Sequence, residues 1–588
     1  MTRRRKKKDE NLFQRRFRNR MLLVAVTFVV AGLLLGARAV NLQFIDQEFF
    51  ARQGDARQMR VVQTAAHRGT ITDRRGEPLA VSSPVDSVWV DPRELRNAPE
   101  RIPQLAEAVG RDADWILRAV SSQPEREFLY LRRHMSPRRA QAVMDLGIRG
   151  VHLQREYRRF YPAGEVAGHL LGFTDIDDAG QEGLELAYDH WLAGEHGQKR
   201  VRRDRLGNVI EDVESIREPR PGRDLRLSLD LRIQYLAYRE LKRAVQAHRA
   251  RSGSMVILDL RSGEVLAMVN QPSFNPNDRS QLNAENYRNR ATNDIFEPGS
   301  SIKPLLVAAA LESGRFDLES RIDTGPGWFT VGAKTIEDHR NLGEIDLGTL
   351  LLRSSNVGAS KVALALEPEQ LWGALRRFGL GEVSATGFPG ESAGVLTEPS
   401  LWRPIGQATL AYGYGLSVTP LQLAHAYAVL GAGGRVAPVS MLALDRPPQS
   451  RQVIEPGVAD AVLELMEPVV SREGTAPKAA IAGYRVAGKT GTARKFTAGG
   501  YHEDRYLSVF AGVAPASEPR LAAVVLINEP DAGVYYGGEV AAPVFSRVIG
   551  DTLRILGIPP DDGTDARSVG TLVQAAPGQA PGQIAGRP

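Results

Sequence analysis

The strongest hydrophobic pattern lies near the start of the chain. Residues 21–37 read MLLVAVTFVVAGLLLGA and contain no charged residue. A helix needs about 20 mostly apolar residues to cross a bilayer. The run reaches that length if Arg38 extends its guanidinium toward the interface. The pattern therefore predicts a transmembrane anchor over residues 21–40.

The flanks of this run predict its orientation and leave one alternative. Residues 1–20 contain ten Lys or Arg and two acidic residues. Because an excess of positive charge stays on the cytoplasmic side, we expect a cytoplasmic basic tail and a single pass through the inner membrane, with the rest of the chain in the periplasm. Ala37-Arg38-Ala39 also fits a signal-peptidase site, although the apolar run exceeds the usual length of about 7–15 residues.

Short alternating segments separated by turns follow the anchor. We expect a polar connector over residues 41–60 and a mixed α/β domain over residues 61–222. Near the start of this mixed domain, residues 68–81 read RGTITDRRGEPLAV, a hairpin pattern with Gly76 in the turn. Beyond it, residues 225–229 alternate like a strand, and the apolar positions then take helical spacing. The change of pattern predicts the main domain boundary between residues 222 and 223.

The pattern of the second domain, residues 223–558, indicates a sheet covered by helices. SMVILDL and EVLAMVN flank a tight turn at Gly263, which is typical of a hairpin. Residues 506–515 and 520–530 form another strand pair, and a last helix is expected over residues 542–556. Strands at both ends of the domain with helices between them predict an α/β (α+β) fold, with an antiparallel sheet closed by distant segments. Residues 559–588 are rich in Gly, Pro, Ala and Gln, which predicts a disordered tail.

Composition and charge narrow the function classes. The formal net charge is +6, but residues 1–20 alone carry +8. The remainder therefore carries −2, which argues against nucleic-acid binding. The chain has no cysteine and no His-Glu-x-x-His motif, so we expect neither a metal site nor a cofactor.

A candidate nucleophile lies at residues 297–307, which read EPGSSIKPLLV. The run that follows Pro298 and Gly299 is apolar and helical in character, with Pro304 in its first turn. Ser300 and Lys303 are three residues apart and so share one face. A serine hydroxyl needs a neighbouring base, and a desolvated lysine near other cations can act as one. The same motif also fits a helix cap followed by a surface lysine.

Two further motifs contain groups that could complete such a site. Ser354 and Asn356 are expected on a loop between helices, where the hydroxyl could relay a proton and the amide could hold a carbonyl; a plain polar turn fits as well. Lys489, Thr490 and Thr492 surround Gly491 in a segment that suits an edge strand, and Gly491 is expected at the substrate site because glycine lets a peptide backbone approach closely. Such a strand can pair with a peptide, while the lysine and the hydroxyls suit a carboxylate. A solvated strand is the plainer interpretation.

The third motif has a competing interpretation. Residues 483–490 match the phosphate-binding pattern G-x-x-x-x-G-K-[ST]. That loop requires a strand before it and a helix after it. Gly491 follows Thr490 at once, and the predicted context is strand–turn–strand, which argues against nucleotide binding. Members of a Ser-His-Asp triad need not be close in sequence, so spacing does not test for one. No Gly-x-Ser-x-Gly elbow is present.

Together, the three motifs occur in the order of the penicilloyl-serine transferases. The chain resembles the class B penicillin-binding proteins, and among these the septal FtsI type, from the anchor to about residue 557. The matching stretches are RGTITDRRGEPLA (68–80), RFYPAGEVAGHLLGF (159–173), GQEGLE (180–185), RRDRLGNVIED (202–212), FEPGSSIKP (296–304), RSSNVGASK (353–361), YGYGLSVTPLQLA (412–424), KTGTARK (489–495) and YYGG (535–538).

The resemblance implies a penicillin-binding transpeptidase fold above a non-catalytic pedestal of dimerisation type. It also implies a D,D-transpeptidase that crosslinks peptidoglycan stem peptides in septal wall synthesis. Ser300 would attack the D-Ala–D-Ala bond with Lys303 as base, and Ser354 and Lys489 would assist proton transfer. Asn356 would hold the donor peptide, and Lys489, Thr490 and Thr492 would hold its carboxylate. The backbone N–H groups of Ser300 and Thr492 would form the oxyanion hole.

The resemblance also implies ligands and partners. β-Lactams would acylate Ser300, and the pedestal would bind the septal glycosyltransferase FtsW and other divisome proteins. One alternative on the same fold is a β-lactam sensor or divisome scaffold without transpeptidase activity. The intact motifs favour the enzyme.

Overall fold

The computed structural model describes residues 2–45, 59–122, 125–203, 209–280, 284–497 and 500–563. Contacts divide the chain into two compact units. The first comprises Met1–Ala66, Pro84–Glu156 and Glu195–Arg220, and the second comprises His67–Ser83, Tyr157–Gly194 and Pro221–Pro588. The predicted boundary after residue 222 lies next to Pro221, where the chain enters the second unit for the last time.

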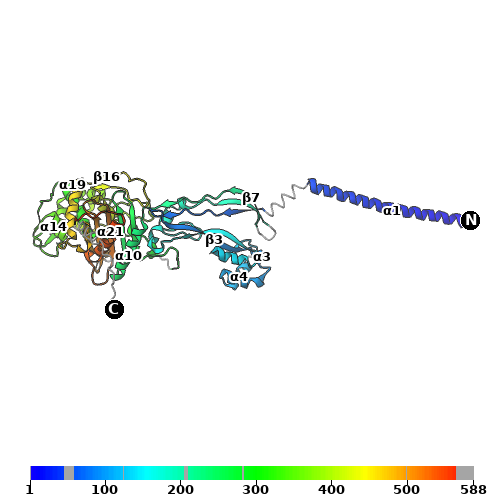
Figure 1. Ribbon diagram of the computed structural model, residues 1–588, viewed down its shortest axis with the longest axis horizontal. Coiled ribbons are helices and arrows are strands. Elements are labelled where there is room, and N and C mark those ends of the chain that lie inside the picture. The colour runs from blue at the N-terminus through cyan, green and yellow to red at the C-terminus, as the bar shows by residue number, and fades with distance from the viewer. Residues whose placement is uncertain are drawn as a thin grey trace, which may run out of the picture. The chain divides into compact units, whose positions relative to one another are not determined.

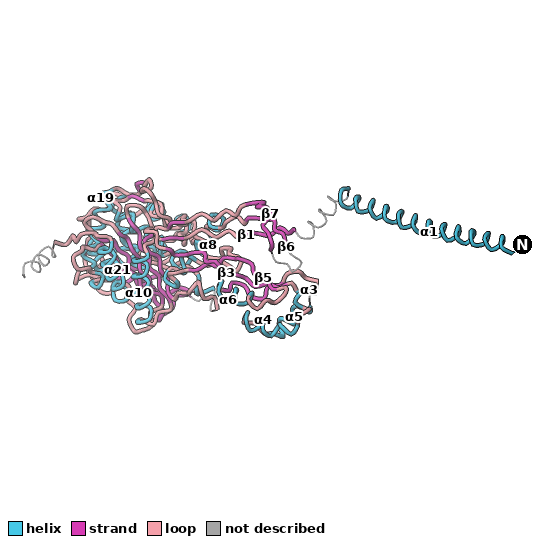
Figure 2. The backbone as a smooth tube through the Cα atoms, turned by 45° about the vertical axis from the view of Figure 1, so that its right-hand side comes forward, coloured by secondary structure: helices cyan, strands magenta, loops and turns pink. Residues whose placement is uncertain are grey.

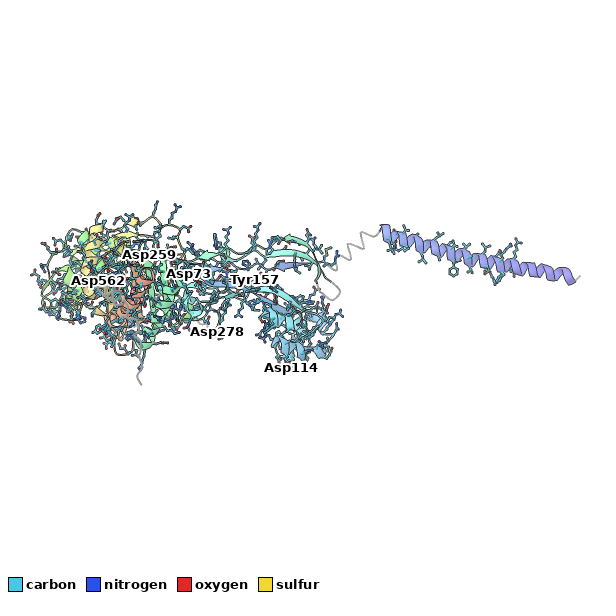
Figure 3. All side chains as sticks on the ribbon, in the orientation of Figure 1. Asp73, Asp114, Tyr157, Asp259, Asp278 and Asp562 are labelled. Atoms are coloured by element: carbon cyan, nitrogen blue, oxygen red, sulfur yellow. The ribbon has the colours of Figure 1, made fainter. Side chains whose placement is uncertain are left out.

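The N-terminal segment is one long helix, α1 (Thr2–Val40), so helical structure begins inside the basic tail. The stretch Arg15–Gln43 is long and apolar enough to cross a membrane, and none of it is buried in the protein. Figure 3 draws side chains along this helix as sticks. A short π-helical turn, Asn41–Ile45, follows. The rest of the predicted connector up to residue 58 lies outside the described residues.

The first unit contains a three-stranded antiparallel sheet in the order β1-β6-β7, drawn in magenta in Figure 2. A separate apolar core forms where amphipathic helices α4 and α5 pack with α6 and the paired strands β3 and β4. The elements are β1 (Met59–Thr64), β3 (Pro78–Val90), α3 (Pro92–Leu95), α4 (Ile102–Val109), α5 (Ala113–Ser122), β4 (Leu129–Met135), α6 (Pro137–Met144), β5 (Val151–Phe160), β6 (Gly197–Arg203) and β7 (Val209–Arg217).

Short elements at the start of the second unit confirm two predictions. β2 (Ile71–Thr72) pairs with the beginning of β3 across a turn in which Gly76 has φ +90°, as the hairpin pattern predicts. β8 (Leu225–Arg226) pairs with β2 in parallel, so the strand predicted over residues 225–229 is present but shorter. Helix α10 (Leu231–Ala247) then begins after Asp230, whose side chain accepts a hydrogen bond from the Arg232 N–H.

The main sheet of the second unit has five antiparallel strands in the order β10-β9-β19-β18-β17. The predicted hairpin β9 (Ser252–Asp259) and β10 (Val265–Gln271) pairs with β19 (Leu521–Asn528), with Val256 opposite Val524. The sheet is thus closed by distant segments, as predicted. β18 (Gly500–Ala514) and β17 (Ala487–Thr497) complete it and leave β17 at the edge.

The strands β9, β10 and β19 are buried along nearly their whole length, because helices cover the sheet. Figure 1 shows the green α10 beside the red α21 (Ala542–Ile555), although the two helices are far apart in sequence. The helices between the first and last strands are α11 (Ala284–Tyr287), α12 (Arg290–Asn293), α13 (Lys303–Glu312), α14 (Leu347–Arg353), α15 (Asn356–Ala365), α16 (Pro368–Arg377), α17 (Pro404–Leu410), α18 (Pro420–Gly431) and α19 (Pro456–Met466), with α20 (Gly537–Val540) after β19. Residues 564–588 of the predicted disordered tail lie outside the described residues.

Candidate active site

Ser300 lies in a tight turn at the start of α13. Residues Gly299–Ile302 form a 3₁₀ turn, and the Lys303 N–H donates to the Ser300 carbonyl. The sequence predicts helical structure from this point, and the structure corrects its first turn from α to 3₁₀. The i, i+3 relation survives the change, because a 3₁₀ turn repeats every three residues. Pro304 lies at the helix start, as predicted.

The Lys303 amine is held beneath the cleft by the second motif. Its side chain has no solvent exposure. Nζ lies 2.6 Å from the Ser354 carbonyl oxygen, 2.9 Å from Asn356 Oδ1 and 3.2 Å from Ser354 Oγ. Ser300 Oγ has no hydrogen-bond partner in the described part of the chain and faces the cleft. The first two motifs therefore meet as the sequence predicts.

Ser354 and Asn356 occupy the turn between α14 and α15. Ser354 ends α14 with φ +61°, a left-handed conformation that is unusual for serine. Ser355 caps α15 by accepting a hydrogen bond from the Gly358 N–H at 2.8 Å. Ser354 and Asn356 both line the cleft, and the turn between two helices agrees with the predicted loop.

Asp338 fixes this turn, and the sequence analysis does not identify it. Its carboxylate accepts hydrogen bonds from the Ser355 hydroxyl at 2.5 Å and from the backbone N–H groups of Asn356 and Val357 at 2.5 and 3.1 Å. A carboxylate is favourable at this position because the first N–H groups of a helix lack internal partners. Asp338 belongs to a different segment from the motif, and nothing in the local spacing indicates the pairing.

Lys489 approaches the same hydroxyl from the edge strand β17. Its side chain is also fully buried, and Nζ donates to Ser354 Oγ at 3.0 Å. Ser354 Oγ therefore lies within hydrogen-bonding reach of both amines. Burial lowers the pKa of Lys489 to about 7. At neutral pH the lysine is thus poised between its charged and neutral forms.

The electrostatics of the pair favour an uncharged Lys303. Burial lowers its pKa well below the usual range, the charge on Lys489 lowers the pKa further, and the Asp338 carboxylate partly opposes both effects. Two ammonium groups this close together, both removed from water, repel strongly. A neutral Lys303 can donate to the Ser354 carbonyl and to Asn356 Oδ1 while keeping its lone pair for a hydroxyl proton.

Two of the remaining residues of the third motif line the cleft, and one does not. Thr490 and Thr492 line the cleft; the Thr490 hydroxyl lies 3.0 Å from that of Thr475, and Thr492 Oγ1 accepts a hydrogen bond from the Gly537 N–H. Gly491 does not line the cleft. A Cβ at Gly491 would lie 2.5 Å from the Pro298 carbonyl oxygen, so glycine allows β17 to pack against the turn that contains Ser300.

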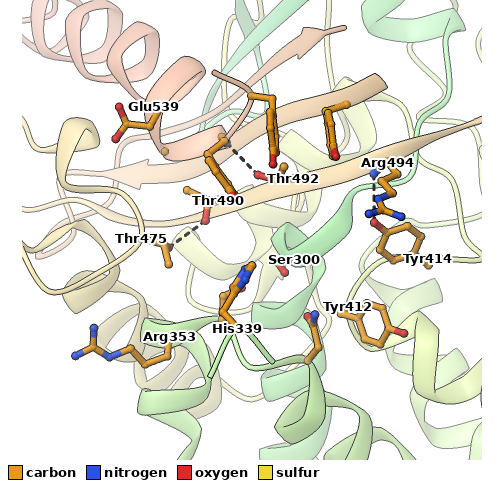
Figure 4. A pocket seen from close by; sticks show the side chains of 17 residues that line it. Ser300, His339, Arg353, Tyr412, Tyr414, Thr475, Thr490, Thr492, Arg494 and Glu539 are labelled. Atoms are coloured by element: carbon orange, nitrogen blue, oxygen red, sulfur yellow. Dashed lines mark hydrogen bonds between the residues drawn. The ribbon is translucent and has the colours of Figure 1, made fainter. Parts of the chain in front are cut away.

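These segments enclose a cleft of 640 Å³, shown in Figure 4. Ser300 lies below β17, with His339 and Arg353 at one end and Tyr412 and Tyr414 at the other. The sequence motifs do not assign a role to the further lining residues His339, Arg353, Tyr412, Tyr414, Thr475, Arg494, Tyr506, Tyr535, Tyr536, Gly537, Gly538 and Glu539. Several of these residues belong to the stretches YGYG (412–415) and YYGG (535–538). The clustered aromatic and glycine residues are the only sequence feature that could have marked them as part of a site.

The nucleotide-binding interpretation of residues 483–490 is wrong. Lys489 and Thr490 lie inside β17, which pairs with β18 from Ala487 onward. No helix follows Thr490, so the N–H groups that a phosphate cradle needs are absent. Among the described residues, no three His, Asp or Glu side chains cluster in a way that could hold a metal ion.

Comparison with known protein families agrees with this geometry. Residues 253–550 match the penicillin-binding protein transpeptidase domain, and residues 63–227 match the penicillin-binding protein dimerisation domain. The first range contains all three motifs of the cleft, and the second covers most of the predicted pedestal.

Individual proteins give the same assignment. The peptidoglycan D,D-transpeptidase FtsI of Escherichia coli is 43% identical over 545 residues, which cover 92% of each chain. The solved TP domain of penicillin-binding protein 3 from Burkholderia pseudomallei is 41% identical, with a TM-score of 0.53 over 57% of this chain and 97% of that one. A peptidoglycan synthetase from Bifidobacterium adolescentis, at 24% identity and a TM-score of 0.69 over 87% of this chain and 99% of that one, shares the fold. The chain therefore belongs to the class B penicillin-binding proteins of FtsI type.

Proposed function

We propose that this chain is a serine D,D-transpeptidase that crosslinks peptidoglycan stem peptides through an acyl-enzyme on Ser300. One observation carries the assignment of the residues. The Ser354 hydroxyl lies 3.0 and 3.2 Å from the amines of Lys489 and Lys303, in a cleft that also exposes Ser300. This arrangement supplies a nucleophile, a desolvated base and a proton relay within one site.

In the acylation step, Ser300 Oγ attacks the carbonyl carbon of the D-Ala–D-Ala bond. Neutral Lys303 takes the hydroxyl proton as the new C–O bond forms. The tetrahedral intermediate then collapses, the C–N bond breaks, and the leaving amine receives a proton through Ser354, which Lys489 holds in place. The products are an ester on Ser300 and free D-alanine, so bonds and protons balance.

Binding of the donor peptide uses the edge of the sheet. β17 has β18 on one side, so an extended peptide can add along its other side. The Asn356 amide suits a donor carbonyl, and the hydroxyls of Thr490 and Thr492 with the charge of Lys489 suit the terminal carboxylate. The backbone N–H groups of Ser300 and Thr492 act as the oxyanion hole, a contribution of about 3–4 kcal/mol per donor in comparable sites.

Resolution of the acyl-enzyme completes the crosslink. An amine from a neighbouring stem peptide attacks the ester carbonyl, and Lys303 accepts the amine proton and returns a proton to Ser300 Oγ. A β-lactam enters the same step as a donor, but its leaving group stays tethered by the opened ring. Ser300 then remains acylated.

The proposal extends to the cellular setting. We place α1 in the inner membrane with its basic end in the cytoplasm, because ten Lys or Arg precede the apolar run. The catalytic unit then lies in the periplasm, where its substrate is assembled. Septal wall synthesis with the glycosyltransferase FtsW and other divisome proteins fits the membership of the FtsI type.

The test is a transpeptidation assay with the full chain in detergent. A stem peptide that ends in D-Ala–D-Ala serves as donor, and a labelled D-amino acid serves as acceptor amine. We expect release of D-alanine and labelled product from the parent chain and none from Ser300→Ala. Ser301→Ala is the matched control, because Ser301 is buried and its hydroxyl donates to the Pro298 carbonyl oxygen. Acylation by penicillin without any transfer to the acceptor would favour a sensor over an enzyme.

A further inference from the structure

A histidine lies in the catalytic cleft, and the chemistry of acylation does not use it. His339 follows β13 (Lys334–Glu337), which pairs with β12 (Trp328–Val331) in a short hairpin. It lines the same cleft as Ser300, and Figure 4 shows its side chain projecting into that cleft on the same side of β17 as Ser300. The residue is exposed, so a molecule that enters the cleft can reach the ring.

The residue before His339 holds the backbone in place. The Asp338 N–H donates to the Gly327 carbonyl oxygen at 2.9 Å, and the Asp338 carboxylate bonds the turn that begins α15. The imidazole itself has no hydrogen bond, ion pair or ring contact with any described residue. A neutral imidazole has one nitrogen that accepts a proton. An unbonded ring on a fixed backbone is therefore available to a molecule in the cleft.

His339 lies at the end of the cleft from which the leaving amine departs. The third motif is assigned to the terminal carboxylate, which belongs to the leaving D-alanine, and the Thr490 hydroxyl of that motif lies 3.0 Å from the Thr475 hydroxyl. Figure 4 shows Thr475 and His339 on the same side of Ser300. Attack by an acceptor amine is the reverse of the departure of the leaving amine. The acceptor therefore approaches the ester from the end of the cleft that His339 lines.

The acceptor step releases a proton that the residues assigned so far do not take. An aliphatic amine in water at neutral pH is mostly an ammonium ion with three N–H protons, and the amide product keeps one of them. A second proton goes to Ser300 Oγ through Lys303. The remaining proton must reach solvent. Lys489 is fully buried, so it cannot pass a proton directly to water.

The side chains that line this cleft leave the imidazole as the group suited to that proton. Arginine stays protonated, and hydroxyl groups are weak bases at neutral pH. The carboxylate of Glu539 is bonded to Lys478. Histidine is the residue type that ordinarily takes up and releases a proton near neutral pH. His339 combines that chemistry with exposure to water.

We infer that His339 is the base that removes the first proton from the acceptor ammonium. The neutral imidazole accepts that proton, and the amine nitrogen then attacks the ester carbonyl carbon. The C–N bond forms, the C–O bond to Ser300 breaks, and the second proton reaches Ser300 Oγ through Lys303. The imidazolium releases its proton to water, so bonds and protons balance. The inference rests on the proposed transpeptidase function and assigns its acceptor as an amine that arrives protonated.

The test measures acyl transfer from a preformed acyl-enzyme, with the full chain in detergent at neutral pH. A donor ester first acylates Ser300, and the acceptor is added afterwards, so acylation does not limit the rate. The acceptors are D-alanine, D-alaninamide and hydroxylamine. D-Alanine and D-alaninamide arrive mostly as ammonium ions, and D-alaninamide lacks the carboxylate. Hydroxylamine is mostly neutral at this pH and has no proton to lose before it attacks.

The readout is the transfer rate with each ammonium acceptor divided by the rate with hydroxylamine. We expect His339→Asn and His339→Gln to lower both ratios by about 10²-fold, at the lower end of the usual contribution of a general base. His190→Asn is the matched control, because His190 is exposed and lies outside the cleft. Its ratios should equal those of the parent chain.

Two results would overturn this inference alone. One is a pair of unchanged ratios in His339 variants that penicillin still acylates. The other is a fall with D-alanine but not with D-alaninamide, which would show that the histidine binds the acceptor carboxylate instead. Absence of transfer from the parent chain to every acceptor would overturn the proposed function, and this inference with it.

Discussion

At the scale of single residues, one hydroxyl links three segments that are far apart in sequence. Ser354 lies 51 residues beyond Lys303 and 135 residues before Lys489, yet both amines reach its Oγ. Neither lysine can be fully charged without a large penalty, because both are removed from water and each repels the other. A lysine is usually protonated at neutral pH. The loss of hydration and the repulsion favour the neutral amine here, which can then accept a proton.

Removal of the Lys303 amine tests its role as base. We expect Lys303→Met to reduce the rate of penicillin acylation by about 10²–10⁴-fold, the usual contribution of a general base. The apolar side chain fills the buried space, so the melting temperature should hold. Acylation at the parental rate in a variant that melts normally would remove Lys303 from the mechanism.

The pH dependence of acylation should respond to the two charges that flank Lys303. A base must be neutral, so the rate rises as the pH passes upward through the pKa of Lys303. Lys489 lowers that pKa and Asp338 raises it. We therefore expect Lys489→Met to move the midpoint of the profile to higher pH and Asp338→Asn to move it to lower pH. The measurement is the second-order acylation rate from about pH 5 to about pH 10. Shifts of the same sign in the two variants would contradict this account.

The sequence alone predicts part of this geometry. Three-residue spacing predicts that Ser300 and Lys303 share a face, and the 3₁₀ turn keeps that spacing. It does not predict Asp338, because the carboxylate reaches the turn through tertiary folding. The roles of Ser354, Asn356 and Lys489 come from the family resemblance, since a hydroxyl, an amide and a lysine in isolation fit ordinary turns and strands equally well.

At the scale of secondary-structure elements, the position of β17 controls the cleft. This edge strand lies against the turn that contains Ser300, and Gly491 makes the close approach possible. Gly537 contributes a second close approach, because a Cβ there would lie 2.5 Å from the Gly491 carbonyl oxygen. The strand is therefore fixed between two backbone segments, which keeps Lys489 and Thr492 at constant positions.

Substitution of Gly491 should separate these elements. A methyl group 2.5 Å from the Pro298 carbonyl oxygen cannot be relieved by rotation of a side chain. We expect Gly491→Ala to lower the free energy of unfolding by about 1–3 kcal/mol and to slow acylation. Gly457→Ala is the matched control, because its Cβ would meet no atom within 4 Å; its stability should stay within about 1 kcal/mol of the parent. Equal stability of the two variants would contradict the packing argument.

Elements with a clear period are the ones that the sequence predicts best. The hairpin β9–β10, the pair β18–β19 and the helix α21 all follow from alternation or helical spacing. The helices between them are harder to predict. In α18, for example, ten of the twelve residues are buried, including Leu421, Leu423 and Val429, so no polar face marks the helical period.

At the scale of the whole molecule, the chain combines an apolar N-terminal helix with two compact units. The units are interleaved in sequence, because the segments 67–83 and 157–194 belong by contacts to the unit that carries the cleft. A linear pattern predicts a single boundary near Pro221, but it cannot reveal that separate sequence segments join the same unit. Long-range pairing depends on the whole fold and leaves little trace in local composition.

The state of the N-terminus distinguishes an anchor from a cleaved leader. We expect the chain to remain in the membrane fraction after a high-salt wash and to yield peptides that include residues before Arg20. The length of the stretch Arg15–Gln43 is the physical reason, since it suffices to span a bilayer. A mature chain that starts at Val40 would show that the segment is removed.

The most direct test of the central claim is the intact mass of the full chain after exposure to penicillin, followed by peptide mapping. The account predicts a mass increase equal to one whole drug molecule, located on Ser300, and none in Ser300→Ala. An adduct on another residue, or an unmodified chain, would contradict the claim that the three motifs together activate this hydroxyl.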